Sequence, residues 1–357
     1  MNEPLQSSPR TPLSGWLILD KPRGLGSTQA VGAVKRALRQ GGYAKTKVGH
    51  GGTLDPLAEG VLPIALGEAT KLAGRMLDAS KIYAFTISFG EETDTLDAEG
   101  AVVARSDRFP PLAAVAAVLY HFTGPIRQLP PAYSALKVDG KRAYELARAG
   151  EEVELAERAV TIHSLELAGG NPGGEPIESA FQTTAGRPDP YDPAAPLELA
   201  ESVTLLAHVS KGTYIRSLAR DIAHALGTVG HITYLRRIKA GPFLQEQAIS
   251  LDKLEETAKG ASLEHLILPL EAGLDDIPAL SLDQTSAQAV RQGRVLSGMP
   301  QSSGLYLAKL GDVPVALMEI TDGTAKVVRG FNLPDVAEWK ETTHVGDRRK
   351  EAGNHFR

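Results

Sequence analysis

A glycine-rich stretch holds the residues with the clearest capacity for chemistry. Residues 48–62 read V-G-H-G-G-T-L-D-P-L-A-E-G-V-L and include two carboxylates, Asp55 and Glu59. Glycine permits positive φ and close backbone approach, and Pro56 fixes the turn directly after Asp55. Such a loop can hold one carboxylate in a set position beside a ligand. The alternative is an ordinary surface turn, which is what most glycine-rich loops are.

A carboxylate held in this way could act as a covalent nucleophile, provided that it is ionised. A guanidinium favours the ionised form, because it is always charged and can grip both carboxylate oxygens through parallel hydrogen bonds. Arg216 is the candidate partner, on an expected helix whose apolar stripe is Ile215, Leu218, Ile222 and Leu226. The alternative is an exposed helical arginine, which contributes little.

Several kinds of chemistry are excluded by what the chain lacks. It has no cysteine, so disulfides, thiolate zinc sites and cysteine nucleophiles are ruled out. It also has no dinucleotide-binding glycine motif with its downstream acid, no P-loop, no zinc-protease H-E-x-x-H and no serine nucleophile elbow. His208, His224 and His231 follow no metal-ligand spacing. These patterns therefore indicate no metal or cofactor site.

The charge of the chain is uneven. Thirty-eight basic and 43 acidic residues give a net charge of −5, which taken alone argues against a nucleic-acid partner. Between Val203 and Gly241, however, the only acid is Asp221, and the basic residues are Lys211, Arg216, Arg220, Arg236, Arg237 and Lys239. A local basic surface can bind phosphates even on an acidic chain, because charges are screened over about 8 Å. A solvated basic face is the commoner explanation of such a cluster.

The elements that would position these residues alternate between strands and helices. Hydrophobic patterning predicts strands at 15–20, 81–90, 160–167, 197–210 and 230–241, and helices at 69–77, 110–122 and 215–227. Ser27 is a plausible N-cap for a helix carrying Val31, Val34 and Leu38. Residues 169–196 are rich in glycine, proline and aspartate without periodicity, and predict an inserted mobile loop.

The overall size allows two domains. At 357 residues the chain exceeds the size at which single cores usually stop growing, about 250 to 300 residues. No apolar run approaches the roughly 18 residues of a membrane helix, and residues 1–13 lack the apolar core of a signal peptide. We expect a cytoplasmic protein without membrane contact.

Several ordered motifs resemble one known family. G-H-x-G-T-L-D-P-x-A-x-G-V-L resembles the signature of the bacterial tRNA pseudouridine-55 synthases, the TruB family. Further matches are D-K-P-x-G from Asp20, K-x-Y at 81–83, D-T-x-D-x-x-G at 94–100, the segment 130–150, K-G-T-Y-I-R at 211–216 and H-x-x-x-L-R-R at 231–237. The resemblance covers about Gly15 to Gly241. It departs from the family at Gly26, where Ser or Thr is usual, and at the insertion.

The resemblance implies a mixed α/β (α+β) fold: a pseudouridine-synthase core with a mainly antiparallel central sheet flanked by helices, followed by a small PUA-like β domain. The implied organisation is a tail (1–13), a catalytic domain (14–250), a linker with short helices (251–276), a PUA-like RNA-binding domain (277–335) and a charged tail (336–357).

The resemblance also implies a reaction and a site. The substrate would be the T arm of tRNA, whose uridine at tRNA position 55 is flipped out and isomerised with Asp55 as nucleophile. Attack at the ribose C1′ and attack at the base C6 both remain open. Tyr83, Tyr214 and Leu235 would line the base pocket beside Arg216, and His50 would hold the disrupted RNA loop open. No protein partner is implied, and we expect a monomer.

Two other functions remain as alternatives. An RNA-binding or tRNA-folding protein with dispensable catalysis would use the same surfaces. A sugar-processing hydrolase would need a second catalytic carboxylate near Asp55, supplied by Glu59, Asp94 or Asp97.

Overall fold

The structure is a computed structural model that describes residues 13–138, 140–151, 153–168, 199–260 and 263–333. The predicted insertion at 169–196 and the two tails, apart from residue 13, lie outside these ranges. Within them, no helix is long and apolar enough to cross a membrane.

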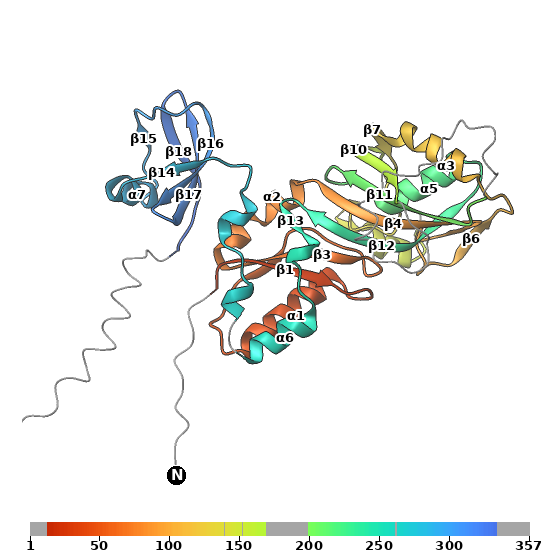
Figure 1. Cartoon of the computed structure of the whole chain (residues 1–357), viewed down its shortest axis with the longest axis horizontal. Helices are drawn as coiled ribbons and strands as arrows, with labels where there is room; N and C mark the ends of the chain where they lie inside the picture. Colours follow the sequence, from red (N-terminus) through yellow and green to blue (C-terminus); the bar gives the residue numbers. More distant parts are fainter. Residues whose placement is uncertain (1–12, 139, 152, 169–198, 261–262, 334–357) are drawn as a thin grey trace, which may run out of the picture.

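A nine-stranded sheet forms the centre of the molecule (Figure 1). Its main path has the order β1-β3-β12-β4-β11-β10-β7. These strands are β1 (Gly15–Lys21), β3 (Glu59–Leu66), β4 (Lys81–Phe89), β7 (Gly124–Gln128), β10 (Arg158–Leu167), β11 (Ser202–Val209) and β12 (Gly230–Ala240). Two short strands, β2 (Val48–His50) and β13 (Phe243–Leu244), pair with β3 and β12. All neighbours are antiparallel except β12 and β3, which confirms the mainly antiparallel sheet.

The join between β12 and β3 is short. Only two residue pairs form this parallel contact, Arg236 with Glu59 and Arg237 with Gly60. On its other edge β12 pairs with β4 along most of its length. The sheet therefore consists of a β1-β3 part and a β12-to-β7 part that meet at a narrow seam.

Helices cover one face of this sheet. They are α1 (Ser27–Gln40), α3 (Leu112–Val118), α5 (Ile215–Ala225) and α6 (Leu251–Lys259). Alternation along β1 shows the two faces, because Leu17 and Leu19 enter the core shared with these helices, whereas Trp16 and Ile18 enter a second core. Figure 1 shows α1 and α6 beneath β1, with α3 and α5 towards the opposite end of the sheet.

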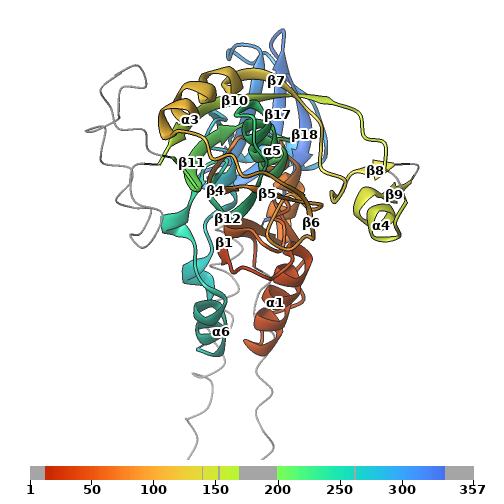
Figure 2. The ribbon, with the colours of Figure 1, turned by 90° about the vertical axis from the view of Figure 1, so that its right-hand side faces the viewer.

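Smaller elements complete this N-terminal part. They are α2 (Ala73–Asp78), α4 (Ala143–Arg148) and two hairpins, β5 (Glu91–Thr93) with β6 (Val102–Arg105) and β8 (Lys137–Val138) with β9 (Lys141–Arg142). In Figure 2, β8, β9 and α4 project sideways from the rest of the molecule.

The C-terminal part is a separate five-stranded sheet with its own core. It has the order β14-β16-β17-β18-β15 and one helix, α7 (Gln284–Arg291). Its strands are β14 (Ala279–Ser281), β15 (Leu296–Ser297), β16 (Gly304–Leu310), β17 (Val313–Thr321) and β18 (Thr324–Gly330). Three of its apolar residues, Leu307, Leu317 and Phe331, join the core that contains Trp16. This small β unit confirms the fold expected for the C-terminal part, and the boundaries of the domains stay predictions.

Two local expectations change in the structure. Gly26, not Ser27, is the N-cap of α1, and the Ser27 hydroxyl instead bonds to Leu54. The helix predicted at 69–77 is a 3-10 helix (Gly67–Leu72) followed by α2.

The segment 251–276, expected to be a linker with short helices, contains α6 and two 3-10 helices in its described residues. Its side chains enter both the core that contains Leu17 and the core that contains Trp16.

Candidate active site

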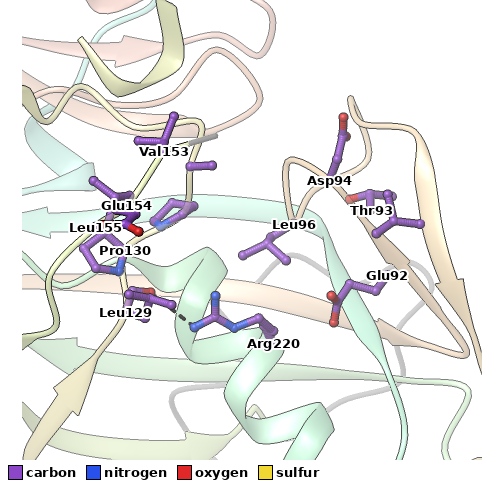
Figure 3. A pocket seen from close by; sticks show the side chains of 13 residues that line it. Glu92, Thr93, Asp94, Leu96, Leu129, Pro130, Val153, Glu154, Leu155 and Arg220 are labelled. Atoms are coloured by element: carbon purple, nitrogen blue, oxygen red, sulfur yellow. Dashed lines mark hydrogen bonds between the residues drawn. The ribbon is translucent and has the colours of Figure 1, made fainter. Parts of the chain in front are cut away.

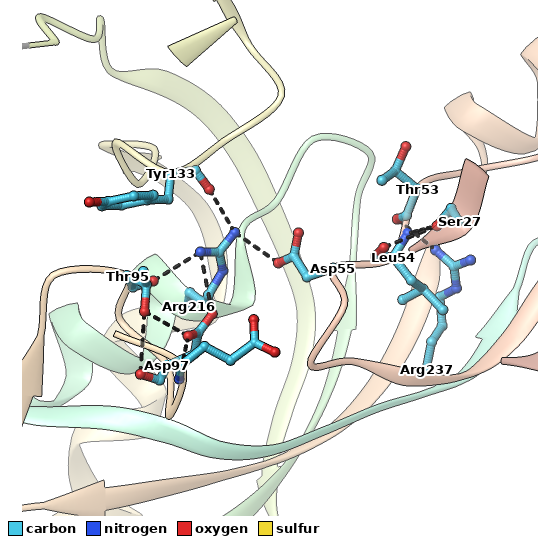
Figure 4. A network of polar contacts seen from close by, with 10 residues as sticks. Ser27, Thr53, Leu54, Asp55, Thr95, Asp97, Tyr133, Arg216 and Arg237 are labelled. Carbon is cyan, nitrogen blue, oxygen red and sulfur yellow. Dashed lines mark hydrogen bonds and ion pairs between the residues drawn. The ribbon is translucent and has the colours of Figure 1, made fainter. Parts of the chain in front are cut away.

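A buried arginine holds the loop that carries Asp55. Arg237, on β12, is 1% exposed. Its guanidinium donates to the carbonyl oxygens of Val61 at 2.7 Å, Gly52 at 3.2 Å and Thr53 at 3.4 Å (Figure 4). Three carbonyls of one glycine-rich segment are thereby fixed by a single planar side chain.

Two further side chains fix the same loop. The Ser27 hydroxyl, in the first turn of α1, donates to the Leu54 carbonyl at 3.0 Å and accepts from the Leu54 N–H at 2.8 Å. The fully buried Lys21 ammonium donates to the carbonyl of Pro56 at 3.3 Å and to two carbonyls of the turn after β1. Its burial lowers the pKa of Lys21 to about 8, and the charge of Asp55 partly opposes this effect. Asp55 therefore lies between two anchored residues.

Arg216 forms the ion pair with Asp55 that the sequence predicts. The distance from Arg216 Nη2 to Asp55 Oδ2 is 2.8 Å. The side chain of Arg216 is 5% exposed, whereas that of Asp55 is 38% exposed. The arginine is thus a buried part of the scaffold, and the carboxylate it orients remains open to a substrate.

The same guanidinium makes three other contacts (Figure 4). It donates to the carbonyls of Thr95 at 2.9 Å and Tyr133 at 3.0 Å, and lies 3.5 Å from Asp97 Oδ2. Asp97 is itself buried and accepts from the Thr95 hydroxyl at 2.6 Å. One positive charge therefore faces two carboxylates, of which only Asp55 is open to solvent.

Helix α5 is anchored next to Arg216. The Gln128 amide accepts from the Tyr214 N–H at 2.8 Å and donates to the Tyr214 carbonyl at 3.0 Å. The Ser217 hydroxyl donates to the Leu129 carbonyl at 2.8 Å. These bonds set the position of the first turn, from which Arg216 extends towards Asp55.

The predicted aromatic and apolar site residues come from three elements. Tyr83 lies on β4 directly opposite Arg237, and Leu235 lies opposite Phe85, so Tyr83 and Leu235 share a face of the sheet. Tyr214 immediately precedes α5, and burial raises the pKa of its hydroxyl above 10. Tyr214 is therefore two residues from Arg216 in the chain. Tyr83 and Leu235 lie on the paired strands β4 and β12, and β12 also carries Arg237, which holds the Asp55 loop.

His50 ends β2, five positions before Asp55. The Gly52 N–H lies 3.4 Å from its Nδ1, in hydrogen-bonding geometry. Burial, and then the positive charge of Arg237, lower the pKa of His50 below 6.5. The imidazole is therefore neutral at pH 7.

Among the described residues, five of the six basic side chains between Val203 and Gly241 are paired with carboxylates or buried, and Lys239 is the sixth. Lys211 pairs with Asp78, Arg220 with Asp221, and Arg236 with both Asp20 and Glu59. Arg216 and Arg237 are buried. The sequence shows one acid in this segment, but folding brings carboxylates from distant elements to these cations.

A pocket of about 620 Å³ lies beside the site rather than at Asp55 (Figure 3). Its lining includes Glu92 and Leu96 from the β5-β6 hairpin, Pro130, Leu155 and Arg220. Arg220 donates to the Leu129 carbonyl at 3.2 Å in its wall. Asp55 does not line this pocket.

Sequence reasoning missed four supporting residues: Lys21, Ser27, Asp97 and Arg237. The sequence offers Asp97 only as a possible second carboxylate of a hydrolase, and its burial behind Arg216 argues against that role. The feature of the sequence that points to Asp97 is its place in the motif D-T-x-D-x-x-G. Within the described residues, no group of three histidine, aspartate or glutamate side chains could hold a metal ion.

Comparison with known proteins adds a family to this geometry. The model of the TruB family pseudouridylate synthase N-terminal domain matches residues 39–186, and that of the tRNA pseudouridylate synthase B C-terminal domain matches 216–275. The tRNA pseudouridine synthase B of Novosphingobium aromaticivorans is 64% identical over 91% of this chain and all of its own length. That of Zymomonas mobilis is 54% identical over 92% of this chain and 99% of its own.

A solved structure has the same fold. It is that of an H/ACA RNP bound to a substrate RNA containing 2′-deoxyuridine, with a TM-score of 0.62 and 24% identity, over 90% of this chain and 86% of the other.

Proposed function

This chain belongs to the TruB family of pseudouridylate synthases, and from this membership we propose that it isomerises the uridine at tRNA position 55, in the T loop, with Asp55 as nucleophile. Pseudouridine synthesis in tRNA is the activity named for its relatives at 64% and 54% identity, and the chain is accordingly a tRNA pseudouridine synthase, an isomerase. What we propose beyond this activity is the modified position in tRNA and the role of each residue.

The single observation that carries these roles is the ion pair between Asp55 and Arg216. The 2.8 Å contact orients one carboxylate oxygen and leaves the carboxylate 38% exposed. A carboxylate must be ionised to attack, and a fixed guanidinium favours that form. Asp55 then attacks either the ribose C1′ or the base C6 of the flipped uridine, and the arrangement suits both routes.

The base needs a pocket once it leaves its stack. Flipping costs a few kcal/mol, and stacking on flat side chains offsets about 1 to 3 kcal/mol for each base. In this proposal Tyr83, Tyr214 and Leu235 surround the base. His50, neutral at pH 7, adds no charge of its own where the RNA loop is held open.

The proposed partner is the T arm of tRNA. The C-terminal β unit serves as a PUA-like RNA-binding domain. We further propose that the protein works in the cytoplasm as a monomer without a protein partner, unlike the structural neighbour above, which was solved within an RNP.

Mass-shift detection of pseudouridine after carbodiimide labelling tests the proposal. An unmodified tRNA transcript is incubated with wild-type protein or the Asp55→Ala variant, without metal or nucleotide. We expect product at the T-loop uridine from the wild type only, with tRNA affinity nearly unchanged in the variant.

Glu59→Gln is the matched control, because it removes the other carboxylate of the same motif, one that pairs with Arg236. This variant should still form product. Product from Asp55→Ala would refute the nucleophile assignment. Binding without product from either protein would favour a tRNA-folding role.

A further inference from the structure

The stretch from the first strand to the Asp55 loop is strongly basic. Residues 22–54 contain no aspartate or glutamate, although the chain as a whole has a net charge of −5. This stretch has six cationic side chains, all exposed, which we call the α1 basic surface: Arg23, Lys35, Arg36, Arg39, Lys45 and Lys47. Six like charges close together repel one another unless something negative is bound to them.

These cations differ from the arginines and lysines around the active site. None of the six forms an ion pair or a side-chain hydrogen bond with a residue in the described ranges, whereas Lys211, Arg216 and Arg236 all pair with carboxylates. An anion can therefore bind to the α1 basic surface without first breaking an internal ion pair.

The α1 basic surface begins at the catalytic loop. The Gly24 N–H donates to the Pro56 carbonyl at 2.7 Å, which places Arg23 beside the residue after Asp55. Helix α1 then starts at Ser27, bonded to Leu54, and its 14 residues extend about 20 Å. The chain returns through Lys45 and Lys47 into β2.

Burial along α1 separates its two sides. Ala30, Val31, Val34, Ala37 and Leu38 are buried, and these positions recur every three or four residues. Lys35, Arg36 and Arg39 fall on the opposite, exposed side. The neighbouring helix α6, which packs against α1, exposes three acids, Asp252, Glu255 and Glu256. This helix also exposes Lys253 and Lys259, so its charges nearly cancel, whereas the charged side chains of α1, which lies beside it in Figure 1, are all basic.

We propose that the α1 basic surface binds the phosphate backbone of the substrate RNA, with Arg23 at the end of this surface next to the Asp55 loop. This inference rests on the proposed function, since that function makes RNA the substrate. Nucleic-acid duplexes carry closely spaced phosphates, so about 20 Å of duplex passes many negative charges along this surface. Arginine and lysine bind them without regard to base sequence.

The test compares two double variants in binding to unmodified tRNA at several salt concentrations. Arg36→Gln with Arg39→Gln removes two unpaired charges from the α1 basic surface. Arg127→Gln with Lys253→Gln removes two exposed charges that are already paired with Glu157 and Glu256. We expect the first variant to bind tRNA about tenfold more weakly, with a salt slope smaller by about 1 to 2, and the control to bind like the wild type.

A second binding measurement uses an isolated T-arm hairpin RNA. Comparison with intact tRNA distinguishes phosphates of the T arm from phosphates elsewhere in the tRNA. A loss of affinity for intact tRNA alone places the contact outside the T arm, and a loss for both RNAs places it within the T arm. Both outcomes support the α1 basic surface. Wild-type affinity and salt slope in the Arg36, Arg39 variant would overturn the inference.

The pseudouridine assay keeps this test separate from that of the proposed function. If the wild type forms pseudouridine and the Arg36, Arg39 variant binds tRNA normally, only the present inference fails. If the wild type forms none but the variant still loses tRNA affinity, the proposed function fails and the surface stands. Equal melting temperatures of the two variants exclude unfolding as the cause.

Discussion

Arg216 is a buried cation shared by two carboxylates with different surroundings. Asp97 is 3% exposed and bonded within its own hairpin, whereas Asp55 is open to solvent on one side. The planar guanidinium joins the β5-β6 hairpin, the segment at Tyr133 and the Asp55 loop at one point. Its geometry matters as much as its charge.

Replacing Arg216 with lysine tests that geometry. Arg216→Lys keeps the charge but cannot reach Asp55, Thr95 and Tyr133 with one planar group. We expect the single-turnover rate to fall by about 100-fold or more, since small misplacements of a reacting group have effects of this size. Arg220→Lys, one turn along α5, is the matched control and should keep most of the rate. A near-normal rate in Arg216→Lys would show that charge alone suffices.

The sequence predicts the contact between Asp55 and Arg216, whose charges are complementary. It does not predict the contacts that depend on how distant segments fold together. A nearby cation favours an ionised carboxylate, and the expected Asp55–Arg216 pair is present, whereas the role of Asp55 as nucleophile stays a proposal. The motif D-T-x-D-x-x-G contains Asp97 but does not show that Asp97 faces Arg216, because only the fold of the β5-β6 hairpin brings it to α5. For the same reason, the sequence does not show that Arg236 pairs with Asp20.

At the scale of elements, β12 supports the Asp55 loop through Arg237. Arg237→Met keeps much of the side-chain volume but leaves the carbonyls of Gly52, Thr53 and Val61 without this donor. We expect the free energy of unfolding to drop by about 3 kcal/mol or more, because buried unpaired carbonyls are costly. Urea unfolding measures this, with Lys239→Met on the same strand as the control. Equal stability of Arg237→Met and wild type would contradict this account of the loop.

Helix α2 ends on the buried Lys81 ammonium, which donates to the carbonyls of Met76, Leu77 and Ala79. Burial, with the charge of Arg237, lowers the pKa of Lys81 from 10.5 to about 8. The unfolded chain therefore binds more protons between about pH 8 and 10.5, so this group makes the free energy of unfolding rise with pH in that window.

Lys81→Met removes the titrating group and serves as the comparison. Between about pH 7.5 and 9.5, we expect the wild type to gain about 1 to 2 kcal/mol of stability relative to this variant in urea unfolding. Parallel pH profiles for the two proteins would show that Lys81 does not titrate there.

Element types were largely predictable, and their boundaries and pairings were not. The strands at β1, β4 and β12 and the helix at α5 follow from hydrophobic periodicity. Ser27 is a good N-cap residue, yet its hydroxyl is used by Leu54, so a tertiary contact overrides the local preference. The parallel contact of β12 with β3 joins segments far apart in the chain, which no local pattern reveals.

At the scale of the whole molecule, the two parts share one apolar core. Phe331 is 2% exposed and belongs to the cluster containing Trp16 and Met76. Polar contacts reinforce the join, since Glu68 accepts from the Asn332 N–H at 2.6 Å and Lys71 donates to the Gly330 carbonyl at 2.8 Å. The C-terminal β unit is therefore packed against the N-terminal part.

Phe331→Ala tests this packing. Removing a buried phenylalanine side chain costs about 3 to 5 kcal/mol, so we expect a lower unfolding midpoint in urea. Val328→Ala is the control, because Val328 lies on β18 and is 52% exposed. Equal losses in the two variants would argue against a shared core.

The narrow seam between β3 and β12 also has a consequence for the order of events on the ribosome. Asp55 emerges early from the ribosome. Arg216 emerges much later, as does Arg237, the β12 residue that bonds to the Asp55 loop. At about 5 to 20 residues per second, roughly 10 to 40 seconds separate them. A nascent chain thus lacks the assembled Asp55–Arg216 pair during most of its own synthesis, and the proposed catalytic centre forms only when the central sheet has closed.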